Sequence, residues 1–181
     1  MIVSMIDQFP PDIYKTIVAL PYRVGLYISM SDRTGGSVSE DRELAALENI
    51  VTFFVEDALK SEFAQTVMLS TLQHKAHWAD WRENIDDVLN ETVEILGYLE
   101  DRIDGRNLTA FRNNLLEIAI TVANAYRETQ ATRSFTARLK DLLTKRHTRS
   151  DVNHAHMNIS QAEKDALNLL ADSLGIAYKV H

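Results

Sequence analysis

The sequence has no cysteine, so disulfide bonds and thiolate metal sites are both excluded. Glycine and proline are scarce, with 6 and 3 among 181 residues, which predicts few and short loops and favours helices. No apolar run reaches the ~18 residues that a transmembrane helix needs. Residues 1–9 lack the basic region and the long apolar region of a signal peptide. We therefore expect a cytoplasmic protein with no transmembrane segment.

Basic charge is also in deficit. The 19 Lys and Arg against 26 Asp and Glu leave a net charge of −7, which repels phosphate backbones and predicts no nucleic-acid binding. The sequence has no Gly-x-Ser-x-Gly motif, which gives no support for nucleophilic catalysis by a serine. It also has no glycine-rich phosphate loop before a Lys-Ser/Thr pair, which excludes nucleotide hydrolysis by a P-loop. The apolar content of 45% is sufficient for the core of one domain over residues 1–181.

Apolar residues recur at helical spacing along nearly the whole chain, which predicts an all-α, multi-helix bundle. Pro21 predicts a kink or a restart in the first helix, because proline lacks an N–H and crowds the carbonyl four residues earlier. The fifth expected helix is apolar around most of its circumference, so we expect it in the middle of the bundle. The six expected helices span residues 13–28, 37–58, 61–72, 85–103, 108–128 and 160–174.

Capping residues support several of these boundaries. Ser37 with Glu40 and Ser160 with Glu163 each have the spacing of a capping box. A glycine at position 175 predicts the end of the last helix.

Residues 129–158 differ in composition from the rest. They are rich in Thr, Arg, Lys, Asn and His and carry one short amphipathic run, so we interpret them as a peripheral insertion that could be deleted. The basic side chains between Arg133 and Arg149 form either a solvated face or a patch that docks an acidic partner or anionic lipid headgroups, as in peripheral membrane association.

Two segments resemble each other. Residues 43–51 and residues 163–171 both read Glu-x-x-Ala-Leu-x-x-apolar-apolar, and each follows a Val-Ser or Ile-Ser loop end. The pattern predicts two related helical halves that share one core. The alternative is that any two capped amphipathic helices look alike.

The same residues carry a family resemblance. The small-residue apolar helix at 115–125, rejoined to the Ser-x-x-Glu helix and Leu-Gly end at 159–176, resembles the tellurite-resistance TerB-like family. Residues 22–51 are similar to the first half of that family, and about half of the chain is covered. The resemblance implies an all-helical fold of two halves, a divalent-cation site, and a role in stress-response and membrane-associated complexes without a defined reaction.

Asp32 and Glu43 are the predicted metal ligands. They flank the Gly35-Gly36 loop, and carboxylates from a loop and the following helix suit Ca²⁺ or Mg²⁺. The alternative is that Glu43 only stabilises the first turns of its helix. The second half has Tyr126 where the family pattern has Asp, so we expect one ion per chain, lost in Asp32→Ala and retained in Glu163→Ala.

Histidines give two weaker patterns. His74 and His77 would share a face if their helix continued, and could hold Zn²⁺ together with a carboxylate; otherwise they are exposed imidazoles beside two half-buried indoles. His154 and His156 alternate, so they either chelate a metal from an extended segment or are solvated.

Three functional interpretations stay open. The leading one is a non-enzymatic helical protein that binds one divalent cation and acts through protein partners in a stress response. The second is a metal-dependent enzyme that uses Asp32, Glu43 and a histidine. The third is a scaffold, for example a homodimer, with no ligand.

Overall fold

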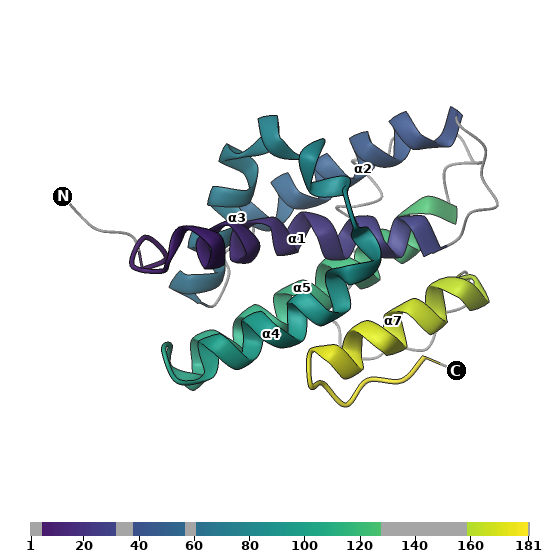
Figure 1. Ribbon diagram of the computed structural model, residues 1–181. Coiled ribbons are helices and arrows are strands. Elements are labelled where there is room, and N and C mark those ends of the chain that lie inside the picture. Colours follow the sequence, from purple (N-terminus) through teal and green to yellow (C-terminus); the bar gives the residue numbers. More distant parts are fainter. Residues whose placement is uncertain (1–4, 32–37, 57–60, 128–158, 181) are drawn as a thin grey trace.

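The computed structural model describes residues 5–31, 38–56, 61–127 and 159–180, and gives only the backbone of residues 38–44, 56, 126 and 127. This part of the chain forms a packed bundle of α-helices without a strand, which confirms the predicted all-α class (Figure 1). The six α-helices are α1 (Pro11–Ser31), α2 (Val38–Glu56), α3 (Glu62–Gln73), α4 (Val88–Glu100), α5 (Gly105–Arg127) and α7 (Gln161–Ser173). Three single 3₁₀ turns, at Lys75–His77, Asp80–Arg82 and Ile85–Asp87, connect α3 to α4. None of the described helices is both long enough and apolar enough to cross a membrane.

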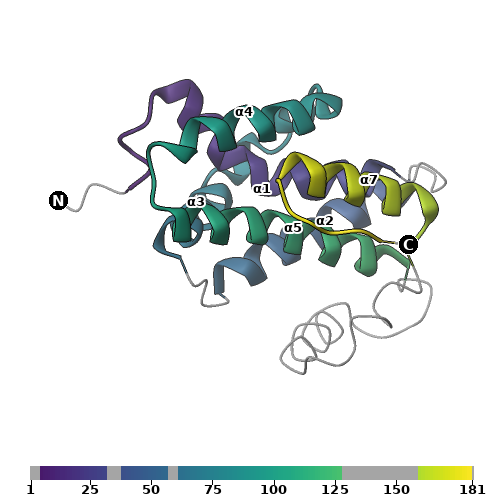
Figure 2. The same ribbon diagram turned by 90° about the horizontal axis from the view of Figure 1, so that it is seen from below.

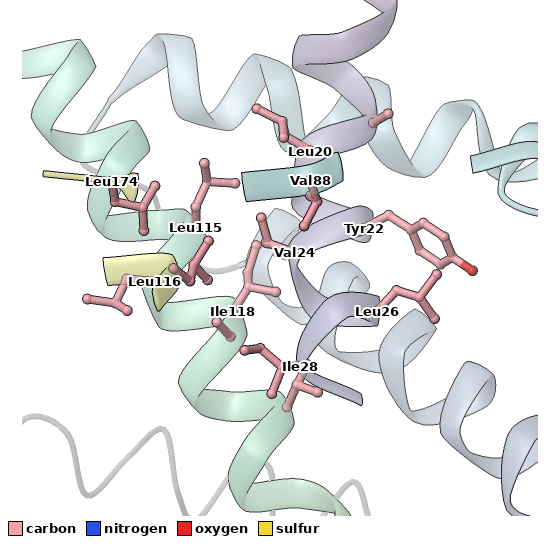
Figure 3. Packing of buried hydrophobic residues seen from close by; sticks show 14 of the residues in the cluster. Leu20, Tyr22, Val24, Leu26, Ile28, Val88, Leu115, Leu116, Ile118 and Leu174 are labelled. Carbon is pink, nitrogen blue, oxygen red and sulfur yellow. The ribbon is translucent and has the colours of Figure 1, made fainter. Parts of the chain in front are cut away.

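Helices α1 and α5 form the centre of the bundle, since each packs against all the other described α-helices. Figure 3 shows Val24 and Ile28 of α1 facing Leu115 and Ile118 of α5. Gly25 permits the close approach of α1 to α2, because a Cβ at this position would lie 2.4 Å from a methyl group of Leu47. The central position predicted for the fifth helix is confirmed.

Helix α1 does not restart at Pro21. It runs unbroken from Pro11 to Ser31, so the expected restart is wrong and the helix continues three residues beyond its expected end at residue 28. A proline inside a helix costs about 3 kcal/mol, because it removes a hydrogen bond and crowds the preceding turn. Pro21 is itself buried, and packing of α1 against every neighbour offsets that cost.

The predicted start of α3 near Ser61 and the predicted capping box at the start of α7 are confirmed. Ser61 accepts a hydrogen bond from the backbone N–H of Ala64 at the start of α3. Ser160 and Glu163 form a complete capping box at the start of α7, and Gly175 follows that helix with φ of +66°. The box predicted at Ser37 lies outside the described residues.

Asp104 separates α4 from α5. Its carboxylate accepts hydrogen bonds from the backbone N–H groups of Arg106 and Asn107, both at 3.0 Å, so α5 begins at Gly105, three residues before the expected start. The hydrogen bond from the Asn107 backbone is the main cause that lowers the pKa of Asp104. Asp104 and Gly105, which directly follow the expected end of the fourth helix at residue 103, therefore start the next helix.

The two Glu-x-x-Ala-Leu helices lie in the same core, as predicted. Leu47 and Ile50 of α2 and Leu167 and Leu170 of α7 belong to one cluster of buried residues. Helices α2 and α7 each pack against both α1 and α5. Superposition of the two halves stays a prediction, and so does the peripheral position of the 129–158 insertion, which lies outside the described residues.

Candidate functional site

The predicted metal ligands are not described by the structure. Asp32 lies outside the described residues, directly after the last residue of α1, and only the backbone of Glu43 is described, within α2. His154, His156 and the basic residues from 133 to 149 also lie outside. In the portion that is described, no three His, Asp or Glu side chains are close enough together to hold a metal ion.

His74 and His77 do not share a helix face. Helix α3 ends at Gln73, and the two imidazoles follow it on a 3₁₀ turn with their ring centroids 6.1 Å apart. His74 Nδ1 lies 2.8 Å from the carbonyl oxygen of Ser70. His77 is exposed, and its Nδ1 lies 3.6 Å from a carboxylate oxygen of Asp80. The helical geometry assumed for a Zn²⁺ pair is therefore wrong.

His74 lies far from the C-terminal end of α1. The ring of His74 packs edge-on against Tyr14, near the start of α1. Ser31 is 17 residues further along the same helix, which corresponds to about 25 Å at 1.5 Å per residue. No side chain spans that distance, so a site at the end of α1 would need a histidine other than His74.

The two indoles in the segment between α3 and α4, those of Trp78 and Trp81, are buried and not half-buried as expected. Trp78 is 7% exposed and Trp81 5%. The ring of Tyr22 stacks on Trp78 with centroids 4.6 Å apart, and Trp78 Nε1 donates to the carbonyl of Thr71. In Figure 3, Tyr22 points to the side of α1 opposite α5, which is the side covered by these turns. Burial raises the pKa of Tyr22, so its phenol is neutral.

Arg23 is the most extensively bonded polar side chain of the described part, and it is 6% exposed. Its Nε and Nη2 donate to the two carboxylate oxygens of Glu91 at 2.9 and 3.1 Å. Nη1 donates to the carbonyls of Trp81 and Glu83 at 2.6 and 2.8 Å, and Nη2 also donates to the carbonyl of Asn84 at 3.0 Å. These five hydrogen bonds match the five N–H donors of a guanidinium group.

The Arg23 cluster, defined as Arg23 with Glu91 and the three carbonyls, fixes the path of the chain between α3 and α4. Asn84 has a positive φ of 51°, a conformation that asparagine tolerates better than most residues. The hydrogen bond from Arg23 to the carbonyl of Asn84 stabilises this residue in that conformation. Since all five donors are engaged within the protein, the cluster is a positioning element and not a ligand site.

Sequence reasoning missed this cluster. The available signal was a single Arg23 in a helix that is otherwise apolar from Ile17 to Ile28, because a charge in such a stretch is buried only with partners. The partners lie some 60 residues away in the sequence, so local periodicity does not predict them.

Comparisons of the sequence with protein-family models and with curated proteins, and of the structure with solved structures, gave no match. The TerB-like resemblance therefore stays a prediction.

Proposed function

We propose that this chain is a non-enzymatic, TerB-like helical protein that binds one divalent cation between Asp32 and Glu43 and acts through protein partners in a stress response. The observation that supports it most is the packing of α2 and α7, each against both α1 and α5. Two related halves that share one core would pack in this way, and α3 and α4 share the same contacts with α1 and α5. The cation and the stress-response role in this proposal are those that the TerB-like resemblance implies, and the helical bundle is the scaffold that would carry the cation site.

The second half supports a stoichiometry of one ion. Glu163 is the counterpart of Glu43 in the repeat, but the residue is only 3% exposed and its carboxylate accepts a hydrogen bond from the backbone N–H of Ser160. A carboxylate already used as a helix cap contributes little to an ion site. In the proposal only the Asp32 side of the molecule binds the cation, through several oxygen ligands as Ca²⁺ and Mg²⁺ prefer.

A thermal-shift screen tests the cation. The full chain is stripped with a chelator and then melted with Ca²⁺, Mg²⁺, Mn²⁺ or Zn²⁺ in turn, since an ion that binds only the folded state raises the melting temperature. We expect at least one ion to raise it, and Asp32→Ala to remove the shift. Glu163→Gln is the matched control, because glutamine retains an acceptor for Ser160 and should leave the shift intact.

The same screen separates the competing functions. A shift that depends on Asp32 but not on a histidine supports a cation-binding partner protein. A shift that also needs one of His77, His147, His154, His156 or His181 favours the metal-dependent enzyme instead. No shift with any ion removes the cation and leaves a scaffold without a ligand.

A further inference from the structure

Asp104 and Gly105 lie where the short link from α4 enters α5, at one end of the bundle (Figure 2). No other Asp or Asn of the sequence is followed by glycine. Both residues are exposed, and a Cβ on Gly105 would meet no other part of the chain within 4 Å. Its φ is not positive, since Gly175 is the one described glycine with a positive φ. Packing and backbone conformation therefore do not require glycine at this position, and no side chain of residue 105 shields the carboxyl group of Asp104.

An Asp-Gly bond can rearrange without an enzyme. The backbone nitrogen of the glycine attacks Cγ of the neutral aspartic acid, so that an N–Cγ bond forms and the Cγ–OH bond breaks. The hydroxyl group leaves as water with the proton of the glycine N–H, and a cyclic succinimide results. Water then opens either carbonyl of the ring and gives aspartate again or isoaspartate, in which the chain runs through Cγ. Glycine favours the attack, because it has no Cβ and reaches backbone angles that other residues avoid.

The cap of α5 opposes this reaction in the folded chain. Oδ1 of Asp104 accepts from the backbone N–H groups of Arg106 and Asn107, and Oδ2 accepts from Nδ2 of Asn107. These bonds hold both carboxylate oxygens over the first turn of α5. The hydrogen bond from the Asn107 backbone is also the main cause that lowers the pKa of Asp104, and an ionised carboxylate has no hydroxyl group to lose. Attack by Gly105 therefore requires the first turn to open, and helix ends open at lower free energy than the core.

We propose that the Asp104–Gly105 bond is a site of spontaneous isoaspartate formation, and that the cap at the start of α5 controls its rate. Isoaspartate adds a methylene group to the backbone and attaches the remaining carboxylate directly to Cα. That carboxylate no longer reaches the same N–H groups, so the central helix of the bundle loses its cap. The modification thus changes the link between α4 and α5 as the protein ages. It depends on neither the cation nor a partner, and the proposed function can fail without affecting it.

Ageing the full-length chain at mildly acidic pH, in native buffer and in concentrated urea, tests the proposal. Trypsin cuts after Arg102 and Arg106 and releases residues 103–106, whose aspartate and isoaspartate forms are separated by chromatography against synthetic standards. We expect isoaspartate to accumulate in urea and to form about tenfold more slowly in the native chain, a factor typical of an N-cap. Gly105→Ala should strongly reduce it in both conditions, and the added methyl group has the space to be accommodated in the fold.

A substitution in the cap tests the control of the rate. Asn107→Ala removes the side-chain bond to Oδ2 of Asp104 and should speed the reaction about fivefold in the native chain, with no change in urea. Asn113→Ala, at an exposed position of the same helix, is the matched control and should age like the wild type. Circular dichroism checks that each variant keeps its helices.

Three results would overturn the proposal. Absence of isoaspartate at position 104 in urea, or a Gly105→Ala chain that reacts as fast as the wild type, would refute the site. Equal rates in native buffer and in urea would refute the control by the cap, and so would an Asn107→Ala chain that ages like Asn113→Ala.

Discussion

Replacing Arg23 with methionine should destabilise the protein strongly, because it removes all five hydrogen bonds of the Arg23 cluster and leaves their acceptors behind. The carbonyl of Trp81 is the buried one, and a buried acceptor without a partner costs about 1–3 kcal/mol. The side chain of Glu91 is 31% exposed, so water can solvate its carboxylate in the variant. Breaking the Arg23–Glu91 ion pair therefore costs less than the roughly 3–5 kcal/mol typical of a fully buried pair. We expect a total loss of about 3 kcal/mol.

Urea unfolding measures this loss. With a slope of about 2 kcal/mol per molar, the midpoint of Arg23→Met should fall by about 1.5 M. Intrinsic fluorescence is the suitable probe, because the two tryptophans of the chain, Trp78 and Trp81, both lie in the segment that Arg23 holds. Their emission should shift to the red in the variant even without urea, since the released turns admit water to the indoles.

Arg106→Met is the matched control, since it makes the same change of side chain at an exposed position on the first turn of α5. Its effect should stay within about 0.5 kcal/mol, as for most surface substitutions. If Arg23→Met unfolds at the same urea concentration as Arg106→Met and its emission is unchanged, the cluster does not position the chain between α3 and α4, and the reasoning is refuted.

Three further predictions concern packing and pH. Gly25→Ala should cost about 1–3 kcal/mol in urea unfolding because the new methyl group meets Leu47 at 2.4 Å, whereas Gly97→Ala, with open space around its Cβ, should gain about 0.5–1 kcal/mol; equal effects would contradict the close packing. Asn114→Leu should raise the melting temperature, because Asn114 is 2% exposed and neither of its amide atoms has a hydrogen-bond partner in the described part of the chain; a lower melting temperature would reveal an unseen partner. Burial raises the pKa of Tyr178 to about 12 from 10.0, so the unfolded state ionises first and stability should fall as pH rises from about 10 to about 12; Tyr178→Phe should weaken that fall, and an unchanged pH profile would contradict it.

The sequence predicts those parts of the fold that depend on neighbouring residues. The starts of α3 and α7 follow from Ser61 and from the Ser160–Glu163 capping box, and the end of α7 follows from Gly175. The fully apolar α5 is found at the centre of the bundle. Each of these features depends on hydrogen bonds or periodicity within a few residues, which is the range over which a pattern can be recognised.

What the sequence does not predict depends on distant contacts. The 3₁₀ turns after α3, the burial of Trp81 and the position of Asn84 depend on Arg23, which is about 60 residues earlier in the chain. Helix α1 continues through Pro21 because the surrounding helices pack on it, and local propensity gives no indication of that. Residues 175–180 run back along α7, where the side chain of Asn168 pairs with both backbone groups of Val180, a contact that is visible only in three dimensions.

Among the predicted site residues, Asp32 lies outside the described part of the chain and Glu43 is described only as part of α2. The separation of His74 from the end of α1 was not predictable, because it depends on α3 packing against the first half of α1.

Isothermal titration of Ca²⁺ and of Mg²⁺ into the chelator-treated full chain tests the central claim most directly. The account predicts one ion per chain, no binding in Asp32→Ala, and unchanged binding in Glu163→Gln, whose carboxylate is already a helix cap. Absence of heat with either ion, a stoichiometry of two, or binding that survives Asp32→Ala would contradict it.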